Sequence, residues 1–123
     1  MKILTVDDAK TVRQILRNIL EPCGYCVLEA ENGRIALEMI QQEPGINVIF
    51  LDWDMPELDG YAFLHLFRQR DPDHKIKVIM LTAANKMVHI LDALEAGADE
   101  YIMKPFTKEM VMEKLRYISG YDC

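Results

Sequence analysis

Hydrophobic residues along this chain follow two patterns, short continuous runs and helical stripes. The runs are rich in β-branched and aromatic side chains, which is typical of strands buried on both faces of a parallel sheet. They predict five strands, at residues 3–6, 25–28, 48–52, 78–81 and 101–103. The run at 48–52 is the most informative one, because four apolar residues that we expect to be buried are followed by a carboxylate, Asp52.

Between these runs, apolar residues recur at the spacing of one helix face. Five helices are predicted: one over residues 10–21, one after Asn32, one over 61–70, one over 85–96, and one for which Thr107 serves as N-cap. In the third helix we expect Leu64 and Phe67 to face the core and Arg68 to face solvent. In the fourth we expect Val88, Leu91 and Leu94 to face inward, with Gly97 as a left-handed C-cap.

Five strands that alternate with five helices predict one doubly wound α/β domain over residues 1–123, with a parallel sheet and helices on both faces. In such sheets a ligand site lies outside the carboxyl ends of the strands. Four of the predicted strands are followed there by chemically useful side chains: Asp7 and Asp8, Asp52, Thr82, and Lys104.

Composition narrows the classes of function. The net charge of −6 and the lack of a basic stripe argue against a nucleic-acid surface. No apolar run approaches the ~20 residues that span a bilayer, and acids follow the amino terminus too soon for a signal peptide. We therefore expect a cytoplasmic monomer that binds neither nucleic acid nor membrane. Cys23 and Cys26 have C-x-x-C spacing but lack the four ligands of a structural zinc site, so we interpret them as ordinary cysteines.

Asp7, Asp8 and Asp52 would place three carboxylates in one small pocket, where their mutual repulsion favours binding of a cation. Carboxylate oxygens suit a hard divalent ion, and Mg²⁺ is the best candidate because it leaves positions for water and phosphate. With the metal and Lys104 neutralising a phosphoryl group, Asp52 could act as a nucleophile, and Thr82 could donate its hydroxyl to a phosphoryl oxygen.

These motifs resemble those of the receiver domain of two-component response regulators. The resemblance covers the whole chain and rests on five motifs in order: Asp7-Asp8, Asp52-Trp53-Asp54-Met55-Pro56, Asp59-Gly60, Thr82-Ala83 and Lys104-Pro105-Phe106. It implies the flavodoxin-like strand order 2-1-3-4-5.

The resemblance also implies a role for each site residue. Asp52 would accept a phosphoryl group from a histidine kinase or a small phosphodonor. Asp8 and Asp52 would bind Mg²⁺ directly, Asp7 through its water shell and Asp54 through its backbone carbonyl. Lys104 would pair with the phosphoryl group and precede a cis peptide bond to Pro105.

A two-state switch would transmit the signal. The resemblance implies that Thr82 moves toward the phosphate while the ring of Tyr101 turns inward. It further implies an output face on the fourth helix, fifth strand and fifth helix. Our candidates for a partner-binding patch there are Met87, Ile90, Tyr101, Met103 and Lys114.

The preferred function is a stand-alone signalling switch rather than an enzyme, since the chain ends at Cys123 directly after the last predicted helix. The Asp52 loop and residues 100–106 look most like chemotaxis regulators that engage a flagellar motor. A phosphorelay carrier or phosphate sink is the alternative within this class. A haloacid dehalogenase-type phosphohydrolase also uses an Asp-x-Asp pair, such as Asp52 and Asp54, but there the metal-binding acids follow the lysine. A pseudo-receiver that never takes phosphate is a third alternative.

Overall fold

The computed structural model describes residues 1–53, 55, 58–83 and 88–119, without the side chains of Val88, His89 and Ser119. The described residues form one five-stranded parallel sheet in the order β2-β1-β3-β4-β5. The strands are β1 Lys2–Val6, β2 Cys26–Ala30, β3 Ile46–Asp52, β4 Lys77–Ala83 and β5 Glu100–Lys104. The helices are α1 Lys10–Leu20, α2 Gly33–Gln42, α3 Gly60–Arg70, α4 Val88–Ala96 and α5 Lys108–Ser119, with a 3₁₀ turn, η1, at Glu21–Cys23. The predicted fold class and strand order are therefore confirmed.

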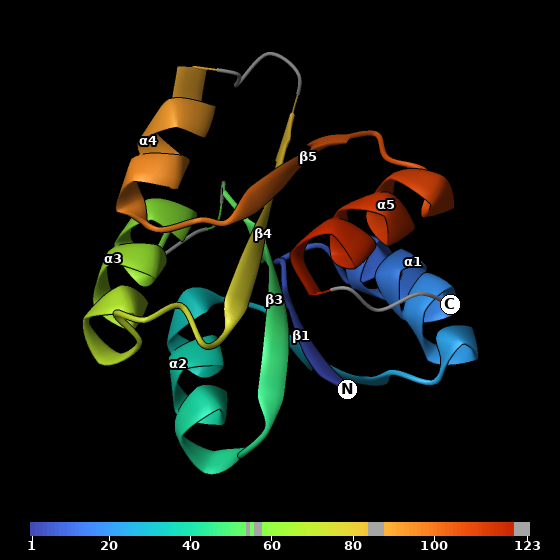
Figure 1. The fold of residues 1–123 in the computed structure, drawn as a ribbon, viewed down its shortest axis with the longest axis horizontal. Helices are drawn as coiled ribbons and strands as arrows, with labels where there is room; N and C mark the ends of the chain where they lie inside the picture. The colour runs from blue at the N-terminus through green and yellow to red at the C-terminus, as the bar shows by residue number, and fades with distance from the viewer. Residues whose placement is uncertain (54, 56–57, 84–87, 120–123) are drawn as a thin grey trace.

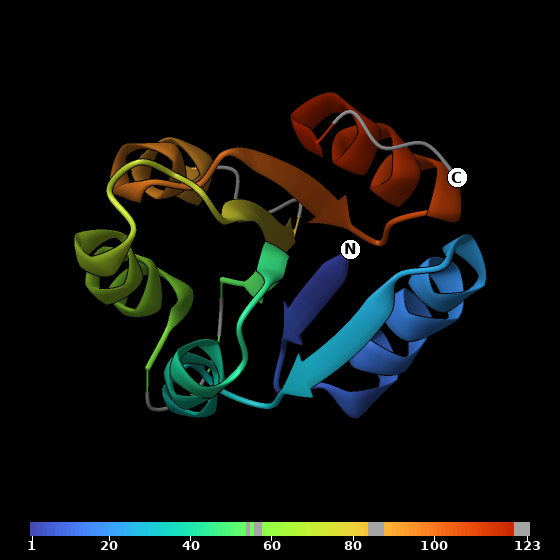
Figure 2. The same cartoon turned by 60° about the horizontal axis from the view of Figure 1, so that its bottom comes forward.

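Helices cover both faces of the sheet. Figure 1 shows α2, α3 and α4 on one side and α1 and α5 on the other, and Figure 2 shows the same two layers from a second direction. Side chains alternate between the faces along each strand. On β3, for example, Ile49 and Leu51 join the core under α2, α3 and α4, whereas Val48 and Phe50 join the core under α1 and α5. Burial on both faces explains why the strands read as continuous apolar runs.

Several helix ends are set by local sequence, as the pattern predicts. The Asn32 side chain accepts a hydrogen bond from Ile35 N at the start of α2, and Thr107 Oγ1 accepts one from Met110 N at the start of α5. Gly97 follows α4 with a φ of 118°, and Ala98 N donates to Ala93 O. The positive φ is why glycine suits this C-terminal position.

The orientation of α4 differs from our prediction. Leu91 is 70% exposed and Leu94 is 40% exposed, whereas Ile90 and Ala93 are buried. Our assignment of Leu91 and Leu94 to the core was wrong, and so was that of Ile90 to an accessible output face. The stripe is wide enough to allow either rotation about the helix axis, and the capped turn at Gly97 into β5 selects the one in which small Ala93 packs inward.

Arg68 also differs from the prediction, since it is only 8% exposed. Its guanidinium donates to the carboxylates of Asp71 and Asp99 and to the carbonyls of Gly97 and Ile76, at distances of 2.8 to 2.9 Å. These partners come from the α3–β4 and α4–β5 connections, and their hydrogen bonds replace the water that the buried guanidinium loses. Two of these partners, Gly97 and Asp99, are distant in sequence and leave no trace in a hydrophobicity pattern.

Candidate phosphoryl site at the carboxyl ends of the strands

The sheet brings together three of the predicted site residues from distant parts of the chain. Asp7 directly follows β1, Asp52 ends β3, and Lys104 ends β5. Strand alternation directs all three toward the face covered by α1 and α5, because each lies two residues beyond a side chain on that face: Thr5, Phe50 and Ile102. Lys104 Nζ donates to Asp7 Oδ2 at 3.0 Å and to Asp52 Oδ1 at 3.3 Å.

The carboxylates differ in burial. Asp7 and Asp52 are 1% and 5% exposed, whereas Asp8 is exposed. Asp7 is held on its other side, because its Oδ1 accepts a hydrogen bond from Ala9 N at 2.8 Å. One carboxylate oxygen from each of Asp7, Asp8 and Asp52 lies within 4.8 Å of the other two. A cluster with two buried acids and one exposed acid is open to solvent on the side of Asp8.

These distances fit a hard divalent cation. Oxygen donors from three carboxylates suit Mg²⁺, which takes one or two of them and keeps water in its other positions. Lys104 supplies one positive charge against three carboxylates, which leaves the cluster with a negative excess. The donor set therefore fits the predicted Mg²⁺, which Asp8 and Asp52 would bind directly and Asp7 through water. Asp54, whose backbone carbonyl we predicted as a further ligand, lies outside the described residues.

The pKa of Lys104 reflects this balance of charges. Burial lowers the pKa of the amine, but the nearby carboxylates of Asp52 and Asp7 outweigh that effect, so the net pKa is raised above its usual 10.5. Lys104 therefore carries a fixed positive charge at neutral pH, directly beside Asp52. It precedes Pro105 through a cis peptide bond, as the family resemblance implied.

Thr82 and Tyr101 lie on the opposite face of the sheet. Thr82 is 1% exposed and follows Leu81, which pairs with Asp52 in the β3–β4 register. Tyr101 pairs with Met80, two residues before Thr82, so both side chains emerge on the face that α4 covers. Tyr101 is half-buried in this arrangement. The structure thus places the proposed switch pair on adjacent strands and on one face.

Gly60, in the Asp59-Gly60 motif, has a structural role that the sequence pattern alone does not reveal. A Cβ on Gly60 would lie 2.8 Å from Trp53 Cα and 2.9 Å from Asp52 O. Gly60 N also donates to Trp53 O at 3.0 Å, and Asp59 caps α3 by accepting from Ala62 N. The start of α3 is therefore packed directly on the backbone of Asp52, which only glycine permits.

The output-face candidates are only partly grouped. Tyr101, Met103 and Lys114 border one cavity of about 270 Å³ on β5 and α5. Lys114 Nζ lies 5.2 Å from the centre of the Tyr101 ring and forms an ion pair of 3.1 Å with Glu100. Ile90 is buried, as described above, and Met87 lies outside the described residues.

The two cysteines of the C-x-x-C spacing do not form a disulfide bond with each other, because Cys26 is a free, exposed thiol on β2. Among the described residues, moreover, no helix has both the length and the apolar character that crossing a bilayer requires.

Comparisons with known proteins agree with this geometry. The family model described as the response regulator receiver domain matches residues 3–116. The chain is 39% identical over 121 residues to the chemotaxis protein CheY1 of Helicobacter pylori, and the match covers 98% of each chain. It is 36% identical to a chemotaxis protein CheY homolog of Campylobacter jejuni, over 98% of this chain and 93% of that protein.

Solved structures show the same fold. The chemotaxis response regulator CheY4 of Vibrio cholerae superposes with a TM-score of 0.86 at 30% identity, over 94% of this chain and 96% of that one. A putative two-component response regulator/GGDEF domain protein superposes with a TM-score of 0.90 at 27% identity, over 95% of this chain but only 48% of that one. The fold thus occurs both in single-domain regulators and within longer proteins.

Proposed function

Because this chain belongs to the response regulator receiver domain family, we propose that it is a phosphorylation-dependent switch in which Asp52 accepts a phosphoryl group from a histidine kinase. The observation that carries the proposal is the position of Lys104 Nζ, within hydrogen-bonding distance of both Asp7 and Asp52, beside a cluster that suits Mg²⁺. Each of these groups comes from a different strand end, and together they form a site for a dianionic phosphoryl group.

The chain's own residues supply most of the chemistry. An Asp52 carboxylate oxygen attacks phosphorus, the new O–P bond forms, and the N–P bond of the phosphohistidine breaks with its electron pair on the leaving imidazole. Lys104 places its charge beside the incoming oxygens, and Thr82 donates its hydroxyl to one of them. Bound Mg²⁺ would supply further positive charge to neutralise the phosphoryl oxygens.

The output is binding to a downstream protein, not turnover of a substrate. Movement of Thr82 toward the phosphoryl group would open space beneath Tyr101, and this would change the surface formed by Tyr101, Met103 and Lys114. The Helicobacter and Campylobacter relatives are chemotaxis proteins, which favours a flagellar motor switch protein as the target and the cytoplasm as the location. Those relatives match over nearly their whole length, which favours action as a single domain.

The first experiment is intact-mass measurement after incubation with acetyl phosphate. We expect a gain of one phosphoryl group that requires Mg²⁺, disappears with a chelator, and is absent in Asp52→Asn. Labelling that persists in Asp52→Asn would exclude Asp52 as the acceptor. Many turnovers on p-nitrophenyl phosphate would instead support a haloacid dehalogenase-type hydrolase, and no labelling at all would support a pseudo-receiver.

The second experiment addresses the target. A purified motor switch protein should bind the chain more tightly with acetyl phosphate and Mg²⁺ than without them, and Lys114→Ala should weaken that binding while it leaves labelling of Asp52 intact. Phosphorylation without any change in affinity for the switch protein would favour the phosphorelay carrier or phosphate sink.

A further inference from the structure

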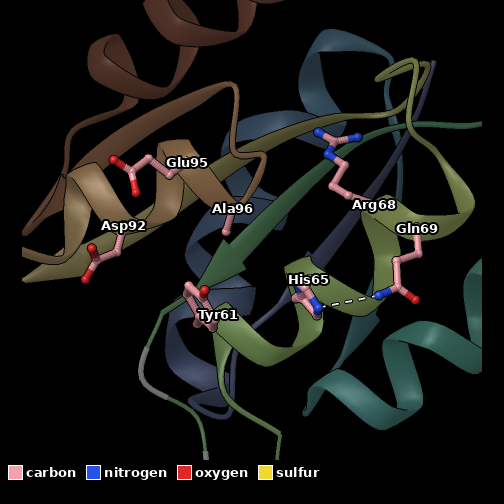
Figure 3. A pocket seen from close by; sticks show the side chains of 7 residues that line it. All are labelled: Tyr61, His65, Arg68, Gln69, Asp92, Glu95 and Ala96. Atoms are coloured by element: carbon pink, nitrogen blue, oxygen red, sulfur yellow. Dashed lines mark hydrogen bonds between the residues drawn. The ribbon is translucent and has the colours of Figure 1, made fainter.

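A second cavity lies between α3 and α4 (Figure 3), and none of Asp7, Asp52 and Lys104 is among the residues that line it. It has a volume of about 440 Å³, which is enough for one long side chain. Its walls combine aromatic, acidic and amide groups from the two helices: Tyr61, His65, Arg68, Gln69, Asp92, Glu95 and Ala96. None of our sequence-based predictions assigned a role to this cavity.

The α3 wall presents a fixed aromatic surface. The rings of Tyr61 and His65 are stacked with their planes 2° apart and centroids 6.5 Å apart. Tyr61 also packs perpendicular to Trp53, with ring centroids 6.0 Å apart, and yet remains 49% exposed. Gln69 lies 3.4 Å from His65 and supports that ring from the next turn of the helix. A half-exposed ring held from two sides offers its face to a ligand at little cost in conformational entropy.

The free charge in the cavity is negative. Arg68 is the one cation among the lining residues, and its guanidinium is already neutralised by Asp71 and Asp99. On the α4 wall, Asp92 and Glu95 are exposed, and within the described part of the chain neither forms an ion pair. The cavity therefore lacks a cation to match its two free carboxylates.

We propose that this cavity is a docking site for an arginine side chain of a partner protein. A guanidinium stacks on aromatic faces and pairs with carboxylates in a planar fork, so it matches both walls, whereas an ammonium ion matches them less well. The net charge of −6 favours a basic partner as a whole. This surface is separate from the one formed by Tyr101, Met103 and Lys114.

Neighbouring residues suggest how the arginine is presented. Leu91 is 70% exposed and lies one helical turn before Glu95, so it borders the acidic wall on the outer side of α4. Leu94, which is 40% exposed, adds apolar surface on the same helix. The docking segment therefore carries an apolar residue beside its arginine.

Occupancy of the cavity is coupled to the neighbourhood of Asp52 through one contact. Tyr61 touches Trp53, which directly follows Asp52 and is the only tryptophan in the chain. An arginine seated on the Tyr61 ring therefore changes the environment of Trp53. The fluorescence of Trp53 therefore gives a second readout of docking that does not depend on phosphorylation.

The test is a titration followed by the amide NMR spectrum of the full chain. The ligand is N-acetyl-arginine-N-methylamide, and the control is the citrulline analogue, which has nearly the same shape but no charge. We expect saturable shifts confined to α3, α4 and Trp53 with the arginine compound, with a dissociation constant on the order of millimolar for a single side chain. The citrulline compound should give no saturable shifts.

Variants test the contribution of each wall to binding of the arginine compound. Asp92→Asn with Glu95→Gln should weaken binding roughly fivefold or more, while Asp73→Asn with Glu109→Gln changes net charge equally on distant exposed sites and should have no effect. Tyr61→Leu should weaken binding, and Tyr61→Phe, which keeps the ring face, should retain it. If Tyr61→Leu does not fold, Tyr61→Phe and the acid pair still decide the outcome.

Three results would overturn the proposal. Equal binding of the citrulline compound would remove the role of charge, and unchanged binding in the Asp92/Glu95 variant would remove these acids as partners. The same shifts on addition of CaCl₂ alone would identify a metal-ion site instead of a docking site for arginine.

Discussion

Single buried charges have large local effects in this molecule, and Arg68 is the clearest case. Burial lowers the pKa of its guanidinium in spite of the opposing effect of Asp99 and Asp71, but the guanidinium remains charged at neutral pH. The side chains of Asp71 and Asp99 are only 12% and 16% exposed, and His74 Nδ1 lies 2.8 Å from Asp99 Oδ1. Arg68 thus joins the end of α3 to the α3–β4 and α4–β5 connections.

We predict that Arg68→Met lowers the free energy of unfolding by roughly 3–5 kcal/mol, because it leaves two mostly buried carboxylates without their cation. Urea unfolding at neutral pH measures this change. Arg70→Met is the matched control, since Arg70 is exposed and makes no ion pair among the described residues. It should change stability by about 0.5 kcal/mol or less. A similarly small effect of Arg68→Met would show that the network is not stabilising.

A second prediction at the residue scale concerns Asp54. The chemotaxis regulators that this chain resembles usually carry asparagine two residues beyond the phosphoacceptor, where this chain has a carboxylate, Asp54. We predict that Asp54→Asn changes the lifetime of phosphorylated Asp52, measured as loss of label over time after removal of acetyl phosphate. Equal rates in both proteins would remove Asp54 from the control of this lifetime.

At the scale of elements, one carboxylate on β2 ties the edge strand to α1. Glu29 accepts hydrogen bonds from Arg13 Nε at 2.9 Å and from Arg17 Nε at 2.8 Å. Burial raises the pKa of Glu29, but the two arginines outweigh that effect, and the net pKa lies below the usual 4.5. The pair of arginines therefore stabilises the ionised carboxylate in the folded state.

A depressed pKa fixes the sign of the pH dependence. The stability that Glu29 contributes is fully present above the unfolded pKa of about 4.5 and is lost as the pH falls through the lower folded value. We predict that Glu29→Gln costs about 1 kcal/mol at pH 7 and that this difference shrinks as the pH falls from 4.5 through the lower folded pKa.

Chemical unfolding of both proteins from pH 7 to pH 3 measures the difference. Glu38→Gln is the control, because its ion pair with Arg34 is exposed on α2 and should contribute little at any pH. A cost of Glu29→Gln that stays constant through this range would show that the ion pairs are not its source.

At the scale of the whole molecule, the acid cluster links metal binding to folding. Asp7, Asp8 and Asp52 are brought together only in the folded chain, since they lie at the ends of β1 and β3. Their repulsion opposes folding, and a cation that binds only the folded state stabilises it. Mg²⁺ should therefore act as a stabilising ligand even without phosphate.

We predict that Mg²⁺ at ten times its dissociation constant raises the free energy of unfolding by about 1.4 kcal/mol, with a rise in Tm of a few degrees. Asp52→Asn should abolish most of this rise, and without metal it should be more stable than the parent because one repulsive charge is gone. Asp73→Asn should keep the full effect of Mg²⁺. Thermal unfolding at matched ionic strength gives these values, and an equal response of Asp52→Asn would place the metal elsewhere.

The sequence by itself determined the strands, the order of the helices and the edge of the sheet at which Asp7, Asp52 and Lys104 meet. The reason is that continuous apolar runs and helical stripes are local signals, and parallel crossovers then force the strand ends to one edge. The tertiary structure alone decided the rotation of α4, which exposes Leu91, and the burial of Arg68. Both depend on tertiary contacts that a hydrophobicity pattern does not encode: the packing of Ile90 and Ala93 into the core for α4, and the carboxylates and carbonyls that surround Arg68. The cavity between α3 and α4 belongs to this second class, since it exists only where two helices pack side by side.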